Sequence, residues 1–125
     1  MIYGIGNDII EVTRIQKAIE RGSGFVEKVF STREIALCNS KGSRVQSYAA
    51  RFAGKEAFMK ALKTGWADGI SWREIEILSY ESGAPYIELT GKTKEYVENE
   101  GITVIHITLS HIKEFAIANV TLECA

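Results

Sequence analysis

The fold is decided by residues 45–63, which read VQSYAARFAGKEAFMKALK. At 100° per residue, the apolar side chains of this stretch, including Phe52, Phe58 and Leu62, occupy most of the circumference of a helix. A helix that is apolar on most sides belongs in a core. We therefore predict a core helix around which the other elements pack, with its charged residues close to buried surroundings.

The stretches on either side of this helix predict an α+β domain, 1–125, whose mostly antiparallel sheet packs around the long central helix. Alternating apolar residues bounded by Gly or Pro indicate strands, and cap residues indicate helix ends. Thr13 is the expected N-cap of the first helix, and Ser31-Thr32-Arg33-Glu34 has capping-box spacing. The expected strands are 2–10, 72–79, 86–89, 102–110 and 115–123, and the other expected helices are 13–21, 25–30, 31–38 and 90–100.

The composition excludes several classes of protein. Hydrophobic residues make up 46% of the 125 residues and charged ones 25%, as in a soluble globular domain. The net charge of -1 gives no basic excess for nucleic acid, and no apolar run is long enough to cross a bilayer. The two cysteines lack metal-ligand spacing, and the first residues lack the features of a secretory leader. We expect a cytoplasmic protein with no nucleic-acid and no membrane partner.

Asp8 stands near the end of the first expected strand. Gly4 and Gly6 beside it have no side chains, so another segment or a ligand can approach closely. The Asp8 carboxylate is either a metal ligand or the cap of the following helix, and its position alone leaves both open. A dinucleotide-binding fingerprint is excluded, because its third glycine would fall on Ile9.

Four charged residues occupy a ten-residue part of the core helix, 51–60. Glu56 and Lys60 have the spacing of a surface ion pair, which contributes about 0.2–0.5 kcal/mol. Alternatively, the carboxylate holds a divalent ion and the ammonium group binds a phosphate. Arg51 and Lys55 form a second stripe, again four residues apart. Because burying unpaired charge is costly, an anionic ligand would account for these four charges.

Two carboxylates and several cations suit Mg²⁺, which prefers a few carboxylates, retained waters and phosphate oxygens. Transfer of a phosphoryl-type group needs mainly charge neutralisation and positioning. Ser110 and His111 lie where the last hairpin turns, and for the histidine a polar turn residue is the simpler interpretation. The residues alone therefore point to phosphate chemistry without assigning every group a role.

Three blocks of the sequence resemble holo-[acyl-carrier-protein] synthases, a family of 4'-phosphopantetheinyl transferases. Their order and separations agree over essentially the whole chain. The chain departs from the family pattern at Asn7, where an apolar or β-branched residue is usual, and at Gly54, where alanine is commoner. The three blocks are GIGNDI (4–9) with RI (14–15), RFAGKEA (51–57) with KAL (60–62), and LSH (109–111) followed by Ala116 and Ala118.

The resemblance implies an enzyme that moves the 4'-phosphopantetheine of coenzyme A onto a serine of apo-acyl carrier protein and releases 3',5'-ADP. It implies that Asp8, Glu56 and Lys60 are catalytic, and that Asp8 and Glu56 hold Mg²⁺ at the diphosphate of coenzyme A. Glu56, directly or through a water, would help to deprotonate the serine, and Lys60 would stabilise the departing 3',5'-ADP. Which group takes the proton stays open.

The resemblance also implies contacts to both substrates, and a homotrimer with its sites between subunits. Arg14, Lys17 and Arg21 would face the carrier protein, and helical spacing places these three cations on one ridge. Fatty acid biosynthesis, and lipid metabolism more widely, is the implied setting, while polyketide and peptide carriers stay open. The implied contacts to coenzyme A are Arg51, Lys55, Lys60, Gly83, Pro85, Ser110 and His111.

Two other functions stay open beside the transferase. A non-catalytic module that binds coenzyme A or a nucleotide would need the cations but neither Asp8 nor Glu56. A metal-dependent phosphohydrolase would release 3',5'-ADP with water alone. The three functions are distinguished by the products that form from coenzyme A with and without a carrier protein.

Overall fold

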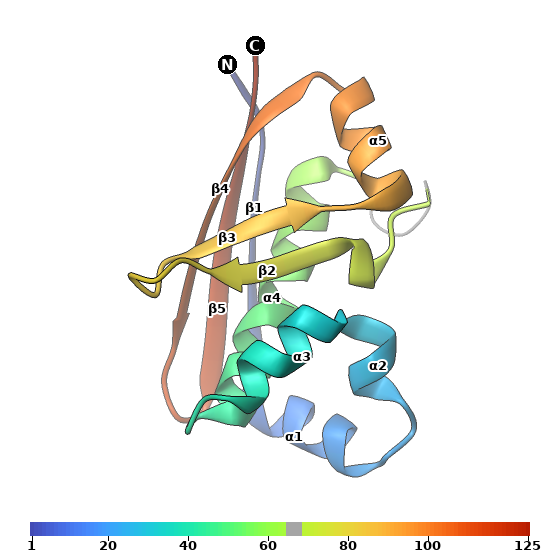
Figure 1. Ribbon diagram of the computed structural model, residues 1–125. Coiled ribbons are helices and arrows are strands. Elements are labelled where there is room, and N and C mark those ends of the chain that lie inside the picture. Colours follow the sequence, from blue (N-terminus) through green and yellow to red (C-terminus); the bar gives the residue numbers. More distant parts are fainter. Residues whose placement is uncertain (65–68) are drawn as a thin grey trace.

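The predicted core helix is α4, and it contacts strands of two antiparallel sheets (Figure 1). The computed structural model describes residues 1–64 and 69–125. Its α+β composition is the one expected from the sequence. The elements are β1 (Ile2–Glu11), α1 (Val12–Glu20), α2 (Phe25–Val29), α3 (Thr32–Asn39), α4 (Arg44–Leu62), the 3-10 turn η1 (Trp72–Glu74), β2 (Ile75–Ser79), β3 (Pro85–Leu89), α5 (Gly91–Asn99), β4 (Ile102–His111) and β5 (Phe115–Cys124).

The larger sheet has the strand order β1-β5-β4, so β1 and β4 form its two edges. β2 and β3 form a separate hairpin, which crosses the larger sheet in Figure 1. The helices α1, α2 and α3 gather at one end of the molecule, and the two termini lie together at the other end. Among the described residues, no helix combines the length and the apolar character needed to span a membrane.

Two glycines of β1 bring α4 close to the larger sheet. A Cβ atom on Gly4 would lie 2.0 Å from the carbonyl oxygen of Ala61, and one on Gly6 would lie 2.0 Å from that of Ala57. Because both obstacles are backbone atoms, they could not move aside as a side chain would. The two glycines therefore set the distance between β1 and α4, and with it the position of Asp8 relative to that helix.

The opposite face of the larger sheet is not covered by the described elements of the chain, and it carries a group of exposed apolar side chains. Ile5 and Ile9 of β1 and Phe115 and Ile117 of β5 are all exposed there. Strand alternation puts them on one face, while Gly4, Gly6 and the buried residues of β5 face α4. A row of exposed large apolar side chains is typical of an interaction surface.

The structure corrects three local predictions. Helix α1 begins at Val12 after Glu11, which forms no side-chain cap, so Thr13 is not the N-cap. The residues Trp72–Glu74 form a 3-10 turn before β2 and are not part of the strand. His111 ends β4 and precedes the turn. The capping box of Ser31 and Glu34 is confirmed.

Candidate active site in two halves

The first cluster lies where β1 and α4 meet, and we call Asp8, Glu56 and Lys60 the acidic half-site. The ammonium group of Lys60 lies 3.1 Å from Oδ1 of Asp8, and their side chains are 55% and 18% exposed. Asp8 caps no helix, because α1 begins at Val12 with Glu11 as its N-cap. Of the two interpretations that the sequence left open, the cap is therefore excluded.

Glu56 lies close enough to Asp8 for their charges to interact. Partial burial raises the pKa of the Glu56 carboxyl, the negative charge of Asp8 raises it further, and Lys60 opposes the shift. The spacing of Glu56 and Lys60 suggested a surface ion pair between them. Among the described residues, Lys60 instead pairs with Asp8. Two carboxylates that repel each other beside one ammonium group form a natural place for a cation.

The donor set of the acidic half-site fits Mg²⁺. Hard carboxylate oxygens are its preferred protein ligands, and it commonly takes only one or two of them while waters and phosphate oxygens complete the shell. Within the described part of the chain, no group of three or more His, Cys, Asp and Glu side chains is gathered as a complete metal site. The two acids therefore suit an ion that arrives together with a phosphate-bearing ligand.

The second cluster is a pocket of about 180 Å³ on the other side of α4, which we call the cationic pocket. Arg51 is nearly buried in its wall, and its guanidinium donates to the Ile77 carbonyl at 3.0 Å and to the hydroxyls of Ser47 and Ser79 at 2.9 and 3.0 Å. The predicted contacts Arg51, Gly83, Pro85 and His111 all line this pocket. The full lining is Lys41, Ser43, Ser47, Ala50, Arg51, Ser79, Gly83, Pro85, Leu109 and His111.

The cationic pocket also contains a basic residue, Lys41, that the sequence did not predict, and it lacks three of the predicted contacts, Lys55, Lys60 and Ser110. Lys41 lies in the short polar stretch between α3 and α4, and no local pattern marks it as a pocket residue. Ser110 was predicted but does not line the pocket. It lies between Leu109 and His111, which do, and alternation along β4 places it on the opposite face.

Lys55, also predicted to contact the ligand, is fully buried instead. Its ammonium group donates to Oε1 of Glu34 and to the carbonyls of Trp72 and Ile75, each at 2.7 Å. These three acceptors use all the protons of the group. Burial lowers the pKa of Lys55, and the neighbouring Glu34 opposes that shift. Lys55 therefore has no free donor for a phosphate. Its charge is neutralised by Glu34, 21 residues away in sequence.

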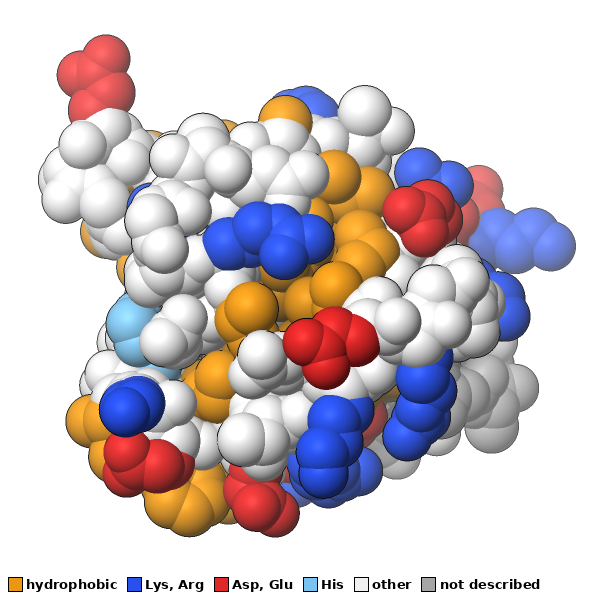
Figure 2. All heavy atoms as spheres, turned by 90° about the horizontal axis from the view of Figure 1, so that it is seen from below, with side chains coloured by type: hydrophobic (Ala, Val, Ile, Leu, Met, Phe, Trp, Pro, Cys, Tyr) orange, Lys and Arg blue, Asp and Glu red, His pale blue; other side chains and the backbone are white. Residues whose placement is uncertain are grey.

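Two cations of α1 and its C-cap residue Arg21 border a groove of about 220 Å³ with an apolar floor, which we call the basic groove. Arg14, Lys17 and Arg21 form its rim, as their helical spacing predicted. Figure 2, which views the end of the molecule where α1 and α2 lie, shows an apolar strip bordered by Lys and Arg side chains and a few acidic ones. The remaining lining residues of the groove are Ile10, Ile15, Ala18, Phe25 and Phe52.

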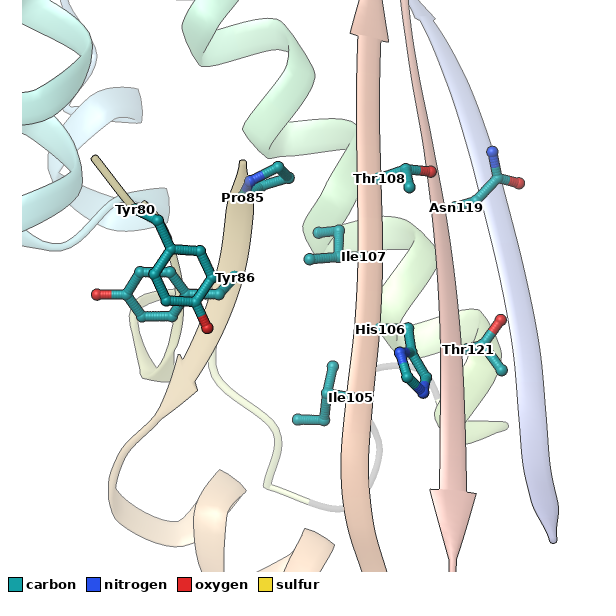
Figure 3. Close-up of a pocket in the computed structure, with 9 residues that line it drawn as sticks. All are labelled: Tyr80, Pro85, Tyr86, Ile105, His106, Ile107, Thr108, Asn119 and Thr121. Carbon is teal, nitrogen blue, oxygen red and sulfur yellow. The ribbon is translucent and has the colours of Figure 1, made fainter. Parts of the chain in front are cut away.

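A further hollow, of about 370 Å³, lies between the β2–β3 hairpin and the edge strand β4 (Figure 3). The rings of Tyr80 and Tyr86 stack at 4.4 Å on the hairpin side. His106, on the β4 side, is 2.5 Å from the Glu123 carboxylate. Because its described lining contains no Lys or Arg, this hollow is less suited to a phosphate than the cationic pocket, with which it shares Pro85.

The acidic half-site and the cationic pocket belong to opposite edges of the larger sheet. Asp8 lies on β1, whereas Leu109 and His111 of the pocket lie on β4, and β5 separates the two strands. On α4, Glu56 and Lys60 approach β1, while Arg51 binds β2. One chain therefore presents two partial sites that face different directions.

Comparisons with known proteins agree with the sequence blocks. The chain is 49% identical over 116 residues to the holo-[acyl-carrier-protein] synthase of Ruminiclostridium cellulolyticum, covering 91% of this chain and 87% of that protein. The solved holo-[acyl-carrier-protein] synthase of Neisseria meningitidis matches with a TM-score of 0.92 and 32% identity, over 98% of this chain and 99% of that one. The synthase of Bacillus anthracis in complex with CoA (3',5'-ADP) matches with a TM-score of 0.82 and 36% identity, over 100% and 99%.

The family model that matches is that of the 4'-phosphopantetheinyl transferase superfamily, and it covers residues 4–120. This range contains the acidic half-site, the basic groove and the cationic pocket. On the match over nearly its whole length, this chain belongs to the 4'-phosphopantetheinyl transferase superfamily.

Proposed function

We propose that this chain transfers the 4'-phosphopantetheine group of coenzyme A to a serine of apo-acyl carrier protein and releases 3',5'-ADP. The observation that carries the proposal is the convergence of Asp8, Glu56 and Lys60 at one end of the contact between β1 and α4. A module that only bound coenzyme A would gain nothing from two carboxylates that repel each other unless a cation lies between them. The superfamily membership supports transfer rather than storage.

Asp8 and Glu56 are the residues that would hold Mg²⁺, which when bound neutralises the diphosphate of coenzyme A. Glu56 accepts the proton of the carrier serine, directly or through a water. Lys60 is half-exposed and has Asp8 as its partner, so it can turn toward a phosphate oxygen. It then stabilises the negative charge that develops on the departing 3',5'-ADP.

The cationic pocket suits the 3'-phosphate end of coenzyme A, with Lys41, Arg51 and His111 as its basic residues and Gly83 and Pro85 in its hairpin wall. At about 180 Å³ it is smaller than the roughly 300–1,000 Å³ of pockets that enclose ligands of drug size. A second surface is therefore needed to enclose the substrate, and the acidic half-site of another copy supplies it.

We infer a closed ring of copies on the same grounds, and the family resemblance implies that it is a homotrimer. Each chain carries the two halves of a site at opposite edges of its larger sheet, so a closed ring would join each half to its counterpart in a neighbour. The uncovered apolar face, with Ile5, Ile9 and Ile117, gives the copies a surface to bury. Such a ring completes as many sites as it has subunits.

The basic groove is the proposed docking surface for the carrier protein. Arg14, Lys17 and Arg21 attract an acidic helix, while Phe25 and Phe52 in the floor accept an apolar side chain. The groove includes Ile10, two residues beyond Asp8 on β1. A serine presented by the docked carrier would therefore lie near the acidic half-site.

The proposal is tested by the mass of the carrier protein. With coenzyme A, Mg²⁺ and apo-acyl carrier protein, the carrier should gain one phosphopantetheine, and the Glu56→Gln variant should lose most of this gain. Binding of coenzyme A with no gain for any carrier would favour a binding module. Release of 3',5'-ADP in the absence of a carrier would favour a phosphohydrolase.

The shared site is tested by mixing two weak variants. Glu56→Gln damages the acidic half-site, and His111→Ala damages the cationic pocket. If each site joins two copies, chains refolded together should recover up to about a quarter of the parent activity by random assembly. If both halves acted within one chain, the mixture would be no more active than its components.

A further inference from the structure

The free edge of β2 is covered by side chains rather than by a strand. β2 pairs with β3 on one side only. On its other edge, the Ile75 carbonyl accepts from Lys55 at 2.7 Å and the Ile77 carbonyl accepts from Arg51 at 3.0 Å. The Ile77 amide donates to Oε2 of Glu34 at 2.9 Å. Charged side chains of α3 and α4 therefore take the place of a neighbouring strand.

The spacing of these contacts fixes the position of β2 along α4. Arg51 and Lys55 are four residues apart on a helix, which is about 6 Å. Their acceptors on Ile75 and Ile77 are two residues apart on a strand, which is about 6.6–6.8 Å. Because the two distances match, the donors reach successive outward carbonyls of the strand, and a shift of β2 by one residue would break both bonds.

Glu34 connects β2 and Lys55 of α4 to helix α3. Its Oε1 accepts from Lys55 at 2.7 Å and from the Ser31 amide at 3.0 Å, while its Oε2 holds Ile77. Glu34 and Lys55 are both fully buried. Gly54, adjacent to Lys55, allows the close approach, since a Cβ atom there would lie 2.5 Å from Cδ1 of Ile77.

The locked strand leads directly into the cationic pocket. β2 ends at Ser79, whose hydroxyl accepts from Arg51 at 3.0 Å, and the chain then forms the turn with Gly83 that leads to Pro85, the first residue of β3. Movement of β2 would therefore displace Arg51, Ser79 and the hairpin wall of the pocket together.

We propose that Glu34 and Lys55 are positioning residues for coenzyme A binding, which act by holding β2 at the register that shapes the cationic pocket. This inference rests on the proposed function. Neither residue needs to touch the ligand. It assigns Lys55 a role that differs from the direct contact expected from the sequence.

The test is the double variant Glu34→Gln with Lys55→Met. It removes both buried charges together, so no unpaired ion is left in the interior, and Met fills a volume similar to that of the lysine chain. The amide that replaces the Glu34 carboxylate retains an oxygen for the Ile77 amide, but it no longer accepts from the Ser31 amide, and the Trp72 and Ile75 carbonyls lose the Lys55 donor. We expect a folded variant whose urea midpoint is lower than that of the parent, because two buried carbonyls lose their donor, and a Kd for coenzyme A, measured by calorimetry, that rises about tenfold. The KM for the carrier should stay unchanged.

Arg33→Gln is the matched control. Arg33 also joins α3 to the hairpin, through Glu76 and Glu88, but it does not touch the backbone at the free edge of β2. It should lower stability slightly and leave the affinity for coenzyme A unchanged. An equal loss of affinity in the control and in the double variant would overturn the positioning role.

Parent-like affinity for coenzyme A in a folded double variant would also overturn the inference, and it would leave the proposed function intact. Absence of transfer by the parent chain would overturn the proposed function instead. If the double variant fails to fold, amide hydrogen exchange of the parent tests whether ligand binding is coupled to β2. Binding of 3',5'-ADP should slow exchange at Ile77 more than at the exposed Thr103, and equal exchange with and without 3',5'-ADP would overturn the inference.

Discussion

The lysines on the two sides of α4 are in opposite states. Lys55 is fully buried, with Glu34 and two carbonyls as acceptors at 2.7 Å. Lys60, little more than one turn further on, is half-exposed and has the Asp8 carboxylate as its partner at 3.1 Å. Both lysines belong to the same charged stretch of sequence. The protein itself satisfies the charge of Lys55, whereas Asp8 is the one acceptor of Lys60 among the described residues, which leaves it donors for a ligand.

The acids differ in the same way. Both carboxylate oxygens of Glu34 accept hydrogen bonds from the surrounding protein. Glu56 lies against Asp8 with a raised pKa, which means that folding has worsened the environment of its charged form. The charges that we propose to be functional, Glu56 and Lys60, are therefore the ones that the described residues compensate incompletely.

The largest expected effect comes from truncating the two lysines separately. Lys55→Met should lower the free energy of unfolding by about 3–5 kcal/mol, because Glu34 would be left buried without its partner. Lys60→Met should change it by less than about 1 kcal/mol, as expected for an exposed pair. Urea unfolding of both variants measures the difference. Similar losses in the two variants would contradict the distinction between the two sides of α4.

The next largest effect is on the rate of phosphopantetheine transfer when Glu56, on the side of α4 that faces Asp8, is changed. Glu56→Gln should reduce the rate of phosphopantetheine transfer by about 10²–10³-fold, in the range seen when a charge-stabilising group is lost from an active site. Its stability should stay equal or rise, since the repulsion with Asp8 disappears. Mass spectrometry of the carrier and urea unfolding measure the two quantities. A variant that is both unstable and inactive would instead indicate a structural role for Glu56.

A smaller effect is expected from a cation that has no acidic partner within the described chain. Arg14 borders the basic groove and forms no ion pair there. Arg14→Glu should raise the KM for the carrier about tenfold and weaken its dependence on salt, because a rim charge acts mainly through long-range attraction. The affinity for coenzyme A should not change, and parallel titrations with both substrates check this.

Much of the fold followed from sequence patterns because those patterns are local. The continuous apolar surface of residues 45–63 predicted the core helix, and the spacing of Ser31 and Glu34 predicted the capping box. Alternation predicted both hairpins. Thr13 failed as a cap because residue type alone does not show where β1 ends and α1 begins.

The site was less predictable, because it depends on contacts between distant residues. The sequence pointed to Asp8, Glu56 and Lys60, and the structure brings them together. It could not separate Lys55 from these, since its partner Glu34 lies 21 residues earlier and on another helix. It also gave no sign of Lys41, whose place in the cationic pocket depends on the packing of a loop against α4 and β4.

The smallest predicted effect tests the close packing of α4 against β2 at Gly54. The higher helix propensity of alanine should raise the free energy of unfolding of Gly54→Ala by up to about 1 kcal/mol, but the new methyl group would lie 2.5 Å from Cδ1 of Ile77. In the Ile77→Val background that carbon atom is absent. In both backgrounds the new methyl group would also lie 3.3 Å from side-chain carbon atoms of Ile107 and Leu109. We therefore expect Gly54→Ala to be more favourable in the Ile77→Val chain than in the parent, by about 0.5–1 kcal/mol. A double-mutant cycle in urea measures this coupling. Equal effects in both backgrounds would mean that the contact between Gly54 and Ile77 does not set the distance from α4 to β2, so that a different contact must keep the Lys55 side closed.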